Sequence, residues 1–172
     1  MIALLTIALL SISCMGQKVN NTTVKDFSLP RYLGTWYEIA RIDHSFEKGL
    51  THTMAEYSLE DDGTVLVTNS GIRNDRLKMS HGKTKLTETP GLIRVSFFGP
   101  FYSDYRVMMV DSEYRYSLVG SKGGNYLWIL SRTPNIPDDV LDLMITEAYR
   151  RGYNIDKLLW VDQDVPGMCY AE

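Results

Sequence analysis

Eight runs of alternating apolar and polar residues follow one another between Gly34 and Arg132. Alternation with a period of two predicts β-strands that bury one face. Turn signals such as Asp61-Asp62-Gly63 and Lys122-Gly123-Gly124-Asn125 separate the runs. The predicted strands lie near residues 34–43, 53–60, 64–71, 78–87, 91–98, 104–111, 114–121 and 125–132.

Strands that follow one another through short turns form an antiparallel up-and-down meander. Such a sheet removes its exposed edges by closing into a barrel, and eight strands leave room for one small ligand. We therefore predict an all-β fold, an eight-stranded antiparallel up-and-down β-barrel.

A helix and a short ninth strand are predicted after the barrel. Residues 136–152 begin with proline and acids, end with two arginines and stop at Gly152, which is the pattern of a helix. Its apolar stripe is expected to pack on the outer wall of the barrel. This stripe consists of Val140, Leu141, Met144, Ile145, Ala148 and Tyr149. Residues 158–161 predict the ninth strand, beside the first.

The inward face follows from the same alternation once Trp36 and Arg132 are placed together inside one end. A guanidinium over an indole contributes about 0.5 to 2 kcal/mol, so this pair is expected to seal that end. The other predicted inward residues are mostly apolar, and several are small, which favours an apolar cavity with a few polar groups. They are Glu38, Ala40, Ala55, Tyr57, Leu59, Val65, Val67, Asn69, Ile93, Val95, Phe97, Tyr105, Val107, Met109, Tyr116, Leu118, Gly120, Tyr126, Trp128 and Leu130.

Composition narrows the classes of partner. A chain of 172 residues fits one domain with one core. The net charge of -3 comes with no basic stripe or acidic tail, which argues against a nucleic-acid partner.

The first thirteen residues are apolar and too few to span a bilayer, as in an export signal. Cys14 follows directly, an arrangement that resembles a lipoprotein processing site, where the cysteine is acylated and becomes the new N-terminus. We expect residues 1–13 to be a signal peptide and residues 14–26 a lipidated polar tether. An ordinary secretory leader is one alternative, and a disulfide between Cys14 and Cys169 is another.

Three blocks of sequence, in order, resemble the lipocalin family. They are Arg31-Tyr32-Leu33-Gly34-Thr35-Trp36-Tyr37-Glu38, Val95-Ser96-Phe97-Phe98-Gly99-Pro100-Phe101-Tyr102 and Tyr126-Leu127-Trp128-Ile129-Leu130-Ser131-Arg132-Thr133-Pro134. The resemblance covers about residues 27–163 and is strongest to the bacterial outer membrane lipoproteins related to apolipoprotein D. It departs from the family at Ser112-Glu113-Tyr114, where Thr-Asp-Tyr is usual. The lipocalin domain is therefore expected over residues 27–172, with Gly34, Trp36 and Arg132 as its structural signature.

The resemblance implies a ligand-holding cup, anchored in the bacterial cell envelope, most simply at the outer membrane. We predict that it binds a fatty acid or lysophospholipid for storage or transport. The best ligand contacts combine large area with polar groups. The predicted contacts are Trp128, Tyr105, Tyr116, Tyr57, Tyr126, Val107, Met109, Phe97 and Glu38. A carboxylate at Glu38 would have a raised pKa or pair with a tyrosine.

The loops at the open end carry more cations than acids and could meet a phosphate or carboxylate headgroup. A solvated surface is the simpler alternative. The residues are His44, Lys48, His52, Arg73, Arg76 and Lys122 against Asp43, Glu47 and Asp75. The histidines lack ligand spacing, so we predict no metal and no cofactor. No catalytic motif is present, so we predict a binding protein. An enzyme on the same fold and a cup with a vestigial cavity are the alternatives.

Overall fold

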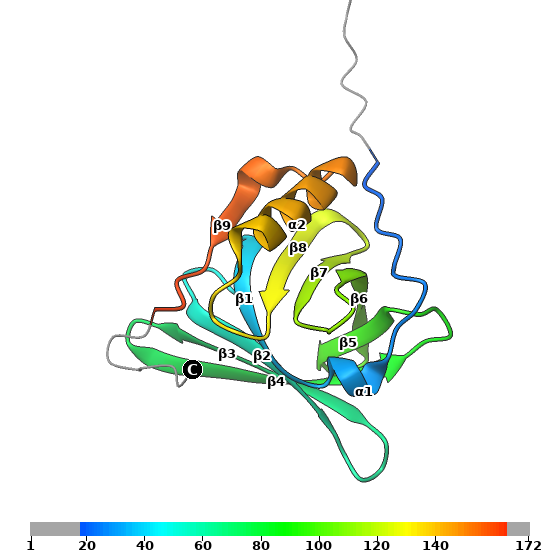
Figure 1. The fold of residues 1–172 in the computed structure, drawn as a ribbon. Helices are drawn as coiled ribbons and strands as arrows, with labels where there is room; N and C mark the ends of the chain where they lie inside the picture. The colour runs from blue at the N-terminus through cyan, green and yellow to red at the C-terminus, as the bar shows by residue number, and fades with distance from the viewer. Residues whose placement is uncertain (1–17, 165–172) are drawn as a thin grey trace, which may run out of the picture.

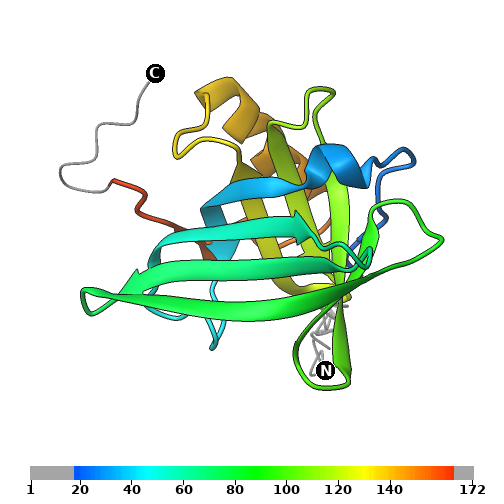
Figure 2. The ribbon, with the colours of Figure 1, turned by 90° about the horizontal axis from the view of Figure 1, so that it is seen from below.

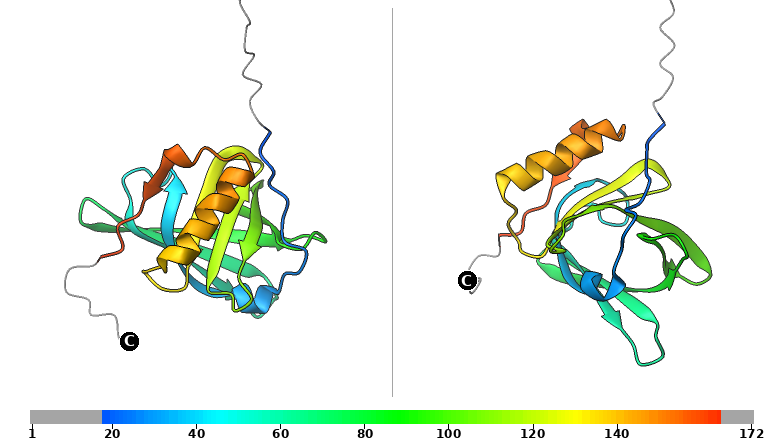
Figure 3. Two further views of the ribbon diagram at one scale, coloured as in Figure 1. Left: turned by 45° about the horizontal axis from the view of Figure 1, so that its top comes forward. Right: turned by 45° about the vertical axis from the view of Figure 1, so that its right-hand side comes forward.

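The computed structural model describes residues 18–164, so the predicted signal peptide, Cys14 and Cys169 lie outside the described residues. Its main element is one antiparallel sheet with strand order β2-β3-β4-β5-β6-β7-β8-β1-β9, closed by pairing of β1 with β2. Figure 1 shows the strands and the helix α2 outside them. The right-hand view of Figure 3 shows the strands closing around one axis. The predicted eight-stranded barrel with a C-terminal helix is confirmed.

The strand bounds agree with the prediction to within a few residues. The barrel strands are β1 (Gly34–Ile42), β2 (Thr51–Leu59), β3 (Val65–Arg73), β4 (Arg76–Leu86), β5 (Leu92–Phe98), β6 (Phe101–Val110), β7 (Tyr116–Ser121) and β8 (Gly123–Ser131). The remaining elements are α1 (Leu29–Tyr32), α2 (Asp138–Arg150), the 3-10 helix η1 (Ile155–Lys157) and β9 (Leu158–Trp160). The β3–β4 hairpin is long and projects from the barrel in Figure 2. The predicted ninth strand forms and pairs with the end of β1.

The closed end is sealed as the sequence predicts. The guanidinium carbon of Arg132 lies 3.9 Å from the centre of the Trp36 ring. Arg132 also donates hydrogen bonds to the carbonyls of Thr35 (2.7 Å), Arg31 (2.8 Å) and Tyr114 (3.1 Å). One charged group thus ties α1, β1 and the β6–β7 turn together.

Two apolar clusters divide the core. The inner cluster fills the closed half of the barrel, and the outer cluster lies between the barrel wall and α2. Met144 and Ala148 of α2 are buried against the outer faces of β1, β6, β7 and β8. The left-hand view of Figure 3 shows α2 lying over this side of the barrel. Tyr149, which we predicted in the packing stripe, is instead exposed.

Irregular register corrects part of the predicted inward face. In β6, a register shift between Val107 and Met109 turns Met109 outward into the cluster under α2. A shift between Glu38 and Ala40 in β1 does the same to Ala40. Leu59 was also predicted inward and is 56% exposed at the closed end.

In β7 the predicted alternation is reversed. Tyr116, Leu118 and Gly120 were predicted inward, but Tyr116 and Leu118 pack with the α2 cluster and a Cβ on Gly120 would meet the Tyr153 hydroxyl. Val119 faces the interior instead. The strand is apolar on both faces because both are covered, so its alternation carries no information about which face is inside.

Residues 18–26, which we predicted as part of the tether, lie along the barrel. The amide of Asn20 donates to the carbonyl of Arg151 (2.8 Å), and the amide of Val24 donates to that of Val107 (3.0 Å). The Arg151 side chain donates in turn to the carbonyl of Thr22 (2.8 Å). This part of the predicted tether therefore belongs to the folded domain.

Candidate ligand-binding site

The interior changes character along the barrel axis. At the closed end, the inward side chains are buried and pack against one another, as in an ordinary core. These residues are Val65, Val67, Ile93, Val95, Val107, Val119 and Leu130. Toward the open end, the inward side chains are only half-buried, so neighbouring side chains do not cover them fully. The half-buried inward residues are Ala55, Asn69, Phe97, Tyr105, Tyr126 and Trp128.

Aromatic side chains line this open half on two strands, β8 and β5. On β8, the rings of Tyr126 and Trp128 are nearly parallel, 5.9 Å between centres at 15°. On β5, the ring of Phe97 lies close to the Cα of Gly82 in β4, where a Cβ would be only 2.9 Å from the ring. A glycine at this position gives the phenyl ring room to lie flat on the neighbouring strand.

A cluster of phenolic hydroxyls forms the floor of the open half. The Tyr32 hydroxyl lies 2.8 Å from that of Tyr105 and 3.2 Å from the Ser117 hydroxyl. The ring of Tyr57 contacts both tyrosines, with centres 5.7 and 5.9 Å away. Burial raises the pKa of Tyr32 to about 12 and also raises the pKa values of Tyr57 and Tyr105. These groups therefore stay neutral and act as hydrogen-bonding hydroxyls.

Arg41 organises the open end from inside the barrel. Its side chain is fully buried and forms an ion pair with Glu38, 2.8 Å between Nη1 and Oε1. It also donates to the carbonyls of Glu47 (3.0 Å) and Leu50 (3.3 Å), and its Nε lies 3.3 Å from Asp43. The β1–β2 loop, residues 43–50, is held by these contacts over the end of β1.

The same loop reaches the aromatic wall of β8. The indole of Trp128 donates to the Glu47 carboxylate (3.2 Å), which also lies 3.0 Å from Nε2 of His44. The His44 ring stacks on Phe46, with 3.8 Å between centres. His44 and Glu47, which we predicted on the rim of the open end, are instead packed against the inner wall.

Glu38 faces inward, as predicted, but its partner is Arg41 and not a tyrosine. Burial and the nearby Glu47 carboxylate raise the pKa of Glu38 to about 8, while the hydrogen bond from Arg41 acts in the opposite direction. Glu38 therefore holds its proton to a higher pH than an exposed glutamate does.

The predicted contact residues separate into three groups. Trp128, Tyr126, Phe97 and Tyr105 line the open half; Tyr57, Val107 and Glu38 are buried within the barrel. The inward placement of Tyr116 and Met109 was wrong, because both pack under α2. Alternation within the strands did not find Tyr32, which lies in α1, or Arg41.

Other features of residues 18–164 do not indicate a metal site or a membrane-spanning helix. No group of three His, Cys, Asp or Glu side chains gathers there in an arrangement that holds a metal ion. None of the helices in this range has the length and apolar character needed to cross a bilayer. A surface hollow of about 660 Å³ beside α1, lined in part by Phe27, Arg31 and Tyr114, lies outside the closed end. Buried Tyr32 and Trp36 separate it from the interior.

The fold, the sealed end and the half-open interior define the class of protein. Residues 27–163 match the lipocalin-like domain family, and the chain belongs to that family.

The relatives identify the branch. The chain is 46% identical over 169 residues to the outer membrane lipoprotein Blc of Escherichia coli K12, covering 95% of this chain and 96% of the relative. It is 42% identical over 155 residues to Blc of Vibrio cholerae, covering 87% and 91%. Mouse apolipoprotein D is 30% identical over 161 residues, covering 87% and 84%. The predicted resemblance to bacterial lipocalins of the outer membrane lipoprotein type is confirmed.

Solved structures agree on the fold. Insecticyanin from the tobacco hornworm matches with a TM-score of 0.69 at 22% identity, covering 82% of this chain and 83% of that one. The cockroach allergen Per a 4 matches with a TM-score of 0.63 at 23% identity, covering 84% and 97%.

Proposed function

We propose that the protein binds one fatty acid or lysophospholipid in the open half of the barrel and carries it unchanged. The observation that supports this most directly is the change along the axis from a packed core to half-buried aromatic walls. Apolar surface left partly uncovered inside a closed fold is stabilised when a ligand covers it. Membership of the lipocalin-like family and similarity to the Blc lipoproteins support a hydrophobic ligand.

The charges support an orientation with the acyl chain inside and the headgroup at the open end. At the closed end, the donors of Arg132 are already directed at three carbonyls, and the tyrosine floor is neutral. At the open end, Lys48, Arg76 and Lys122 are exposed. An anionic headgroup is better placed among these cations than against neutral phenols.

The expected affinity follows from the buried chain. Transfer of each methylene from water to an apolar site contributes up to about 0.8 kcal/mol. Ordering of the ligand and association costs offset much of this sum. We expect dissociation constants of about 1 µM or lower for ligands with long acyl chains.

We also infer that the mature protein is anchored in the bacterial outer membrane through acylated Cys14. The support is the apolar leader before Cys14 in the sequence and the similarity to outer membrane lipoproteins over most of the chain. The intact mass of the protein isolated from its envelope measures the acyl chains directly.

Native mass spectrometry of that material, followed by organic extraction, tests the ligand. A stoichiometric lipid, recovered chemically intact, is the expected result. A ligand converted to a product would support an enzyme instead, and a protein that stays empty when fatty acids are added would refute binding.

Trp128→Ala tests the location of the site. We expect about a tenfold loss of affinity for a fluorescent fatty acid, because an aromatic wall of the open half is removed. Trp160→Ala is the matched control, since Trp160 is 55% exposed on β9 outside the barrel. Equal affinities for the two variants would show that the ligand does not contact β8.

A further inference from the structure

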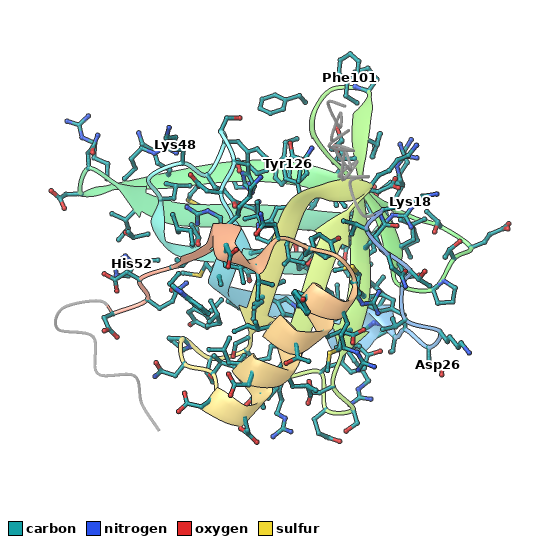
Figure 4. All side chains as sticks on the ribbon, turned by 90° about the horizontal axis from the view of Figure 1, so that it is seen from above. Lys18, Asp26, Lys48, His52, Phe101 and Tyr126 are labelled. Carbon is teal, nitrogen blue, oxygen red and sulfur yellow. The ribbon has the colours of Figure 1, made fainter. Side chains whose placement is uncertain are left out.

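The tip of the β5–β6 hairpin exposes two phenylalanines. Phe98 and Phe101 face each other across the Gly99-Pro100 turn and are 80% and 79% exposed, the highest values among the large apolar residues of the described chain. In Figure 4, the Phe101 side chain projects away from the body of the molecule. Exposed apolar groups at a protruding turn are typical of a surface that contacts another apolar phase.

The hairpin extends beyond its neighbours at the open end. Arg106 pairs with Gly120, one residue before the end of β7, and Phe101 lies five residues further along β6. At about 3.3 Å per residue, the tip lies roughly 17 Å further along the strand than this pair. It is therefore among the outermost points of this end.

The N-terminal chain reaches the same end. The side chain of Asn21 donates to the carbonyl of Ser121 (2.9 Å), and a Cβ on Gly124 would touch Val19, so residue 18 lies beside the β7–β8 turn. Three residues separate Lys18 from Cys14, and the four backbone steps between the two can span at most about 14 Å. An acyl anchor on Cys14 and the hairpin tip are thus able to meet one surface.

Exposed cations surround this end. Lys18, Lys48, Arg76, Lys78 and Lys122 are exposed around the open end, where Asp43 and Asp75 are exposed as well. Figure 4 shows Lys18, Lys48 and Phe101 on one side of the molecule, with Asp26 on the other. Apolar anchors ringed by basic residues are the pattern of a surface that binds anionic lipid headgroups.

We propose that the Phe98–Phe101 hairpin inserts into the anchoring membrane and holds the open end of the barrel against the lipid surface. The partner is an anionic bilayer, and the consequence is that ligand passes between the bilayer and the barrel without crossing bulk water. This inference uses the envelope location proposed above but does not depend on which lipid the barrel holds.

Vesicle flotation tests the surface without the anchor. The protein is the processed chain, residues 14–172, carrying Cys14→Ser, and the vesicles contain phosphatidylethanolamine and phosphatidylglycerol at 3:1. We expect Phe98→Ser/Phe101→Ser to lower the partition coefficient about tenfold or more. Leu59→Ser/Leu86→Ser is the matched control, since these leucines are 56% and 55% exposed at turns of the closed end. Equal partition of both double variants would overturn the proposal.

Insertion is measured in the acylated protein itself. A fluorophore on Phe101→Cys, in a Cys169→Ser background, should shift to shorter emission wavelength on reconstitution and be quenched by spin-labelled lipid. A fluorophore on Leu59→Cys should show neither effect. A probe at residue 101 that stays fully quenched by aqueous iodide would overturn insertion.

Two controls separate this proposal from the others. Fatty-acid affinity without vesicles should be unchanged in Phe98→Ser/Phe101→Ser, so a loss of ligand binding would point to the site and not to docking. Sedimentation velocity measures self-association. A dimer that dissociates in the same variant, with no vesicle binding by the wild type, would assign the hairpin to contact between copies and overturn the membrane proposal.

Discussion

Replacement of Arg132 by alanine should be among the most destabilising single changes at the closed end. The side chain stacks on Trp36 at 3.9 Å and donates three hydrogen bonds to carbonyls of separate segments. Among the described residues 18–164, Arg132 alone donates side-chain hydrogen bonds to all three of these carbonyls. Loss of the guanidinium therefore removes one tie between α1 and the barrel, while the buried Tyr32 keeps its own contacts.

The magnitude can be estimated from the contacts. The stacking contributes about 0.5 to 2 kcal/mol, and a hydrogen bond from a charged donor contributes about 1.5 to 3 kcal/mol. Arg132 is half-buried, so water replaces part of what is lost. We expect Arg132→Ala to reduce the free energy of unfolding by about 3 to 5 kcal/mol, a large part of the total for a domain of this size.

Arg132→Lys separates charge from geometry. An ammonium keeps the cation over the indole but cannot reach three divergent carbonyls as a planar guanidinium does. The expected loss is about 2 kcal/mol, smaller than that of Arg132→Ala. Arg115→Ala is the control, because its ion pair with Asp111 (3.1 Å) is at the surface and should contribute little to stability.

Urea unfolding followed by tryptophan fluorescence and by circular dichroism measures these differences. Unchanged slopes against urea would show that only the native state has altered. If Arg132→Ala lost no more stability than Arg115→Ala, the seal would not stabilise the barrel. Equal losses for the alanine and lysine variants would show that the stabilisation comes from the hydrogen bonds of the guanidinium and not from the positive charge over the indole.

Two other changes probe the interior and the strand phase. Because the pKa of Glu38 is raised to about 8 in the folded protein, folding takes up a proton, and the free energy of unfolding should fall as pH rises from about 4.5 to 8, by up to about 1.4 kcal/mol per pH unit. Glu38→Gln should lose this slope in urea titrations across that range, whereas exposed Glu56→Gln should keep it; a retained slope in Glu38→Gln would assign the proton to another group. Gly120→Ala places a methyl group against the Tyr153 hydroxyl and should cost about 1 to 3 kcal/mol in thermal or urea unfolding. Tyr153→Phe should recover part of that loss, and full additivity of the two changes would contradict the outward phase of Gly120.

The parts of the fold that the sequence predicted well are those with a strong local signal. Each barrel strand buries at least part of one face and is bounded by turn residues, so alternation located all eight. Trp36 and Arg132 could be paired because one opens the first predicted strand and the other closes the last, where a guanidinium can stack on an indole, and because the lipocalin resemblance includes this pair. The helix over residues 138–150 was found through its acids, arginines and apolar stripe.

The site was predicted less well because strand phase depends on neighbours that alternation does not register. Tyr116 and Met109 are apolar enough for either face, and α2 covers the outer one. Only the partner strand reveals which way they point: Val107 opposite Val119 faces in, and Met109 opposite Leu118 faces out. Because a covering helix allows apolar residues on the outer face of a strand, the alternation of apolar and polar residues no longer shows which face is inside.

At the open end, one register shift in β1 changes the position of Arg41 and of the loop that follows it. Regular alternation from Trp36 would place Ala40 inside and Arg41 in solvent. The register shift after Glu38 instead aligns Arg41 with inward Trp128, where its charge is buried. A buried guanidinium needs several partners, and the carbonyls and carboxylates of residues 43–50 supply them together with Glu38. The extra residue in β1 therefore fixes the loop that brings Glu47 to Trp128, and with it the shape of the entrance through which a ligand must pass.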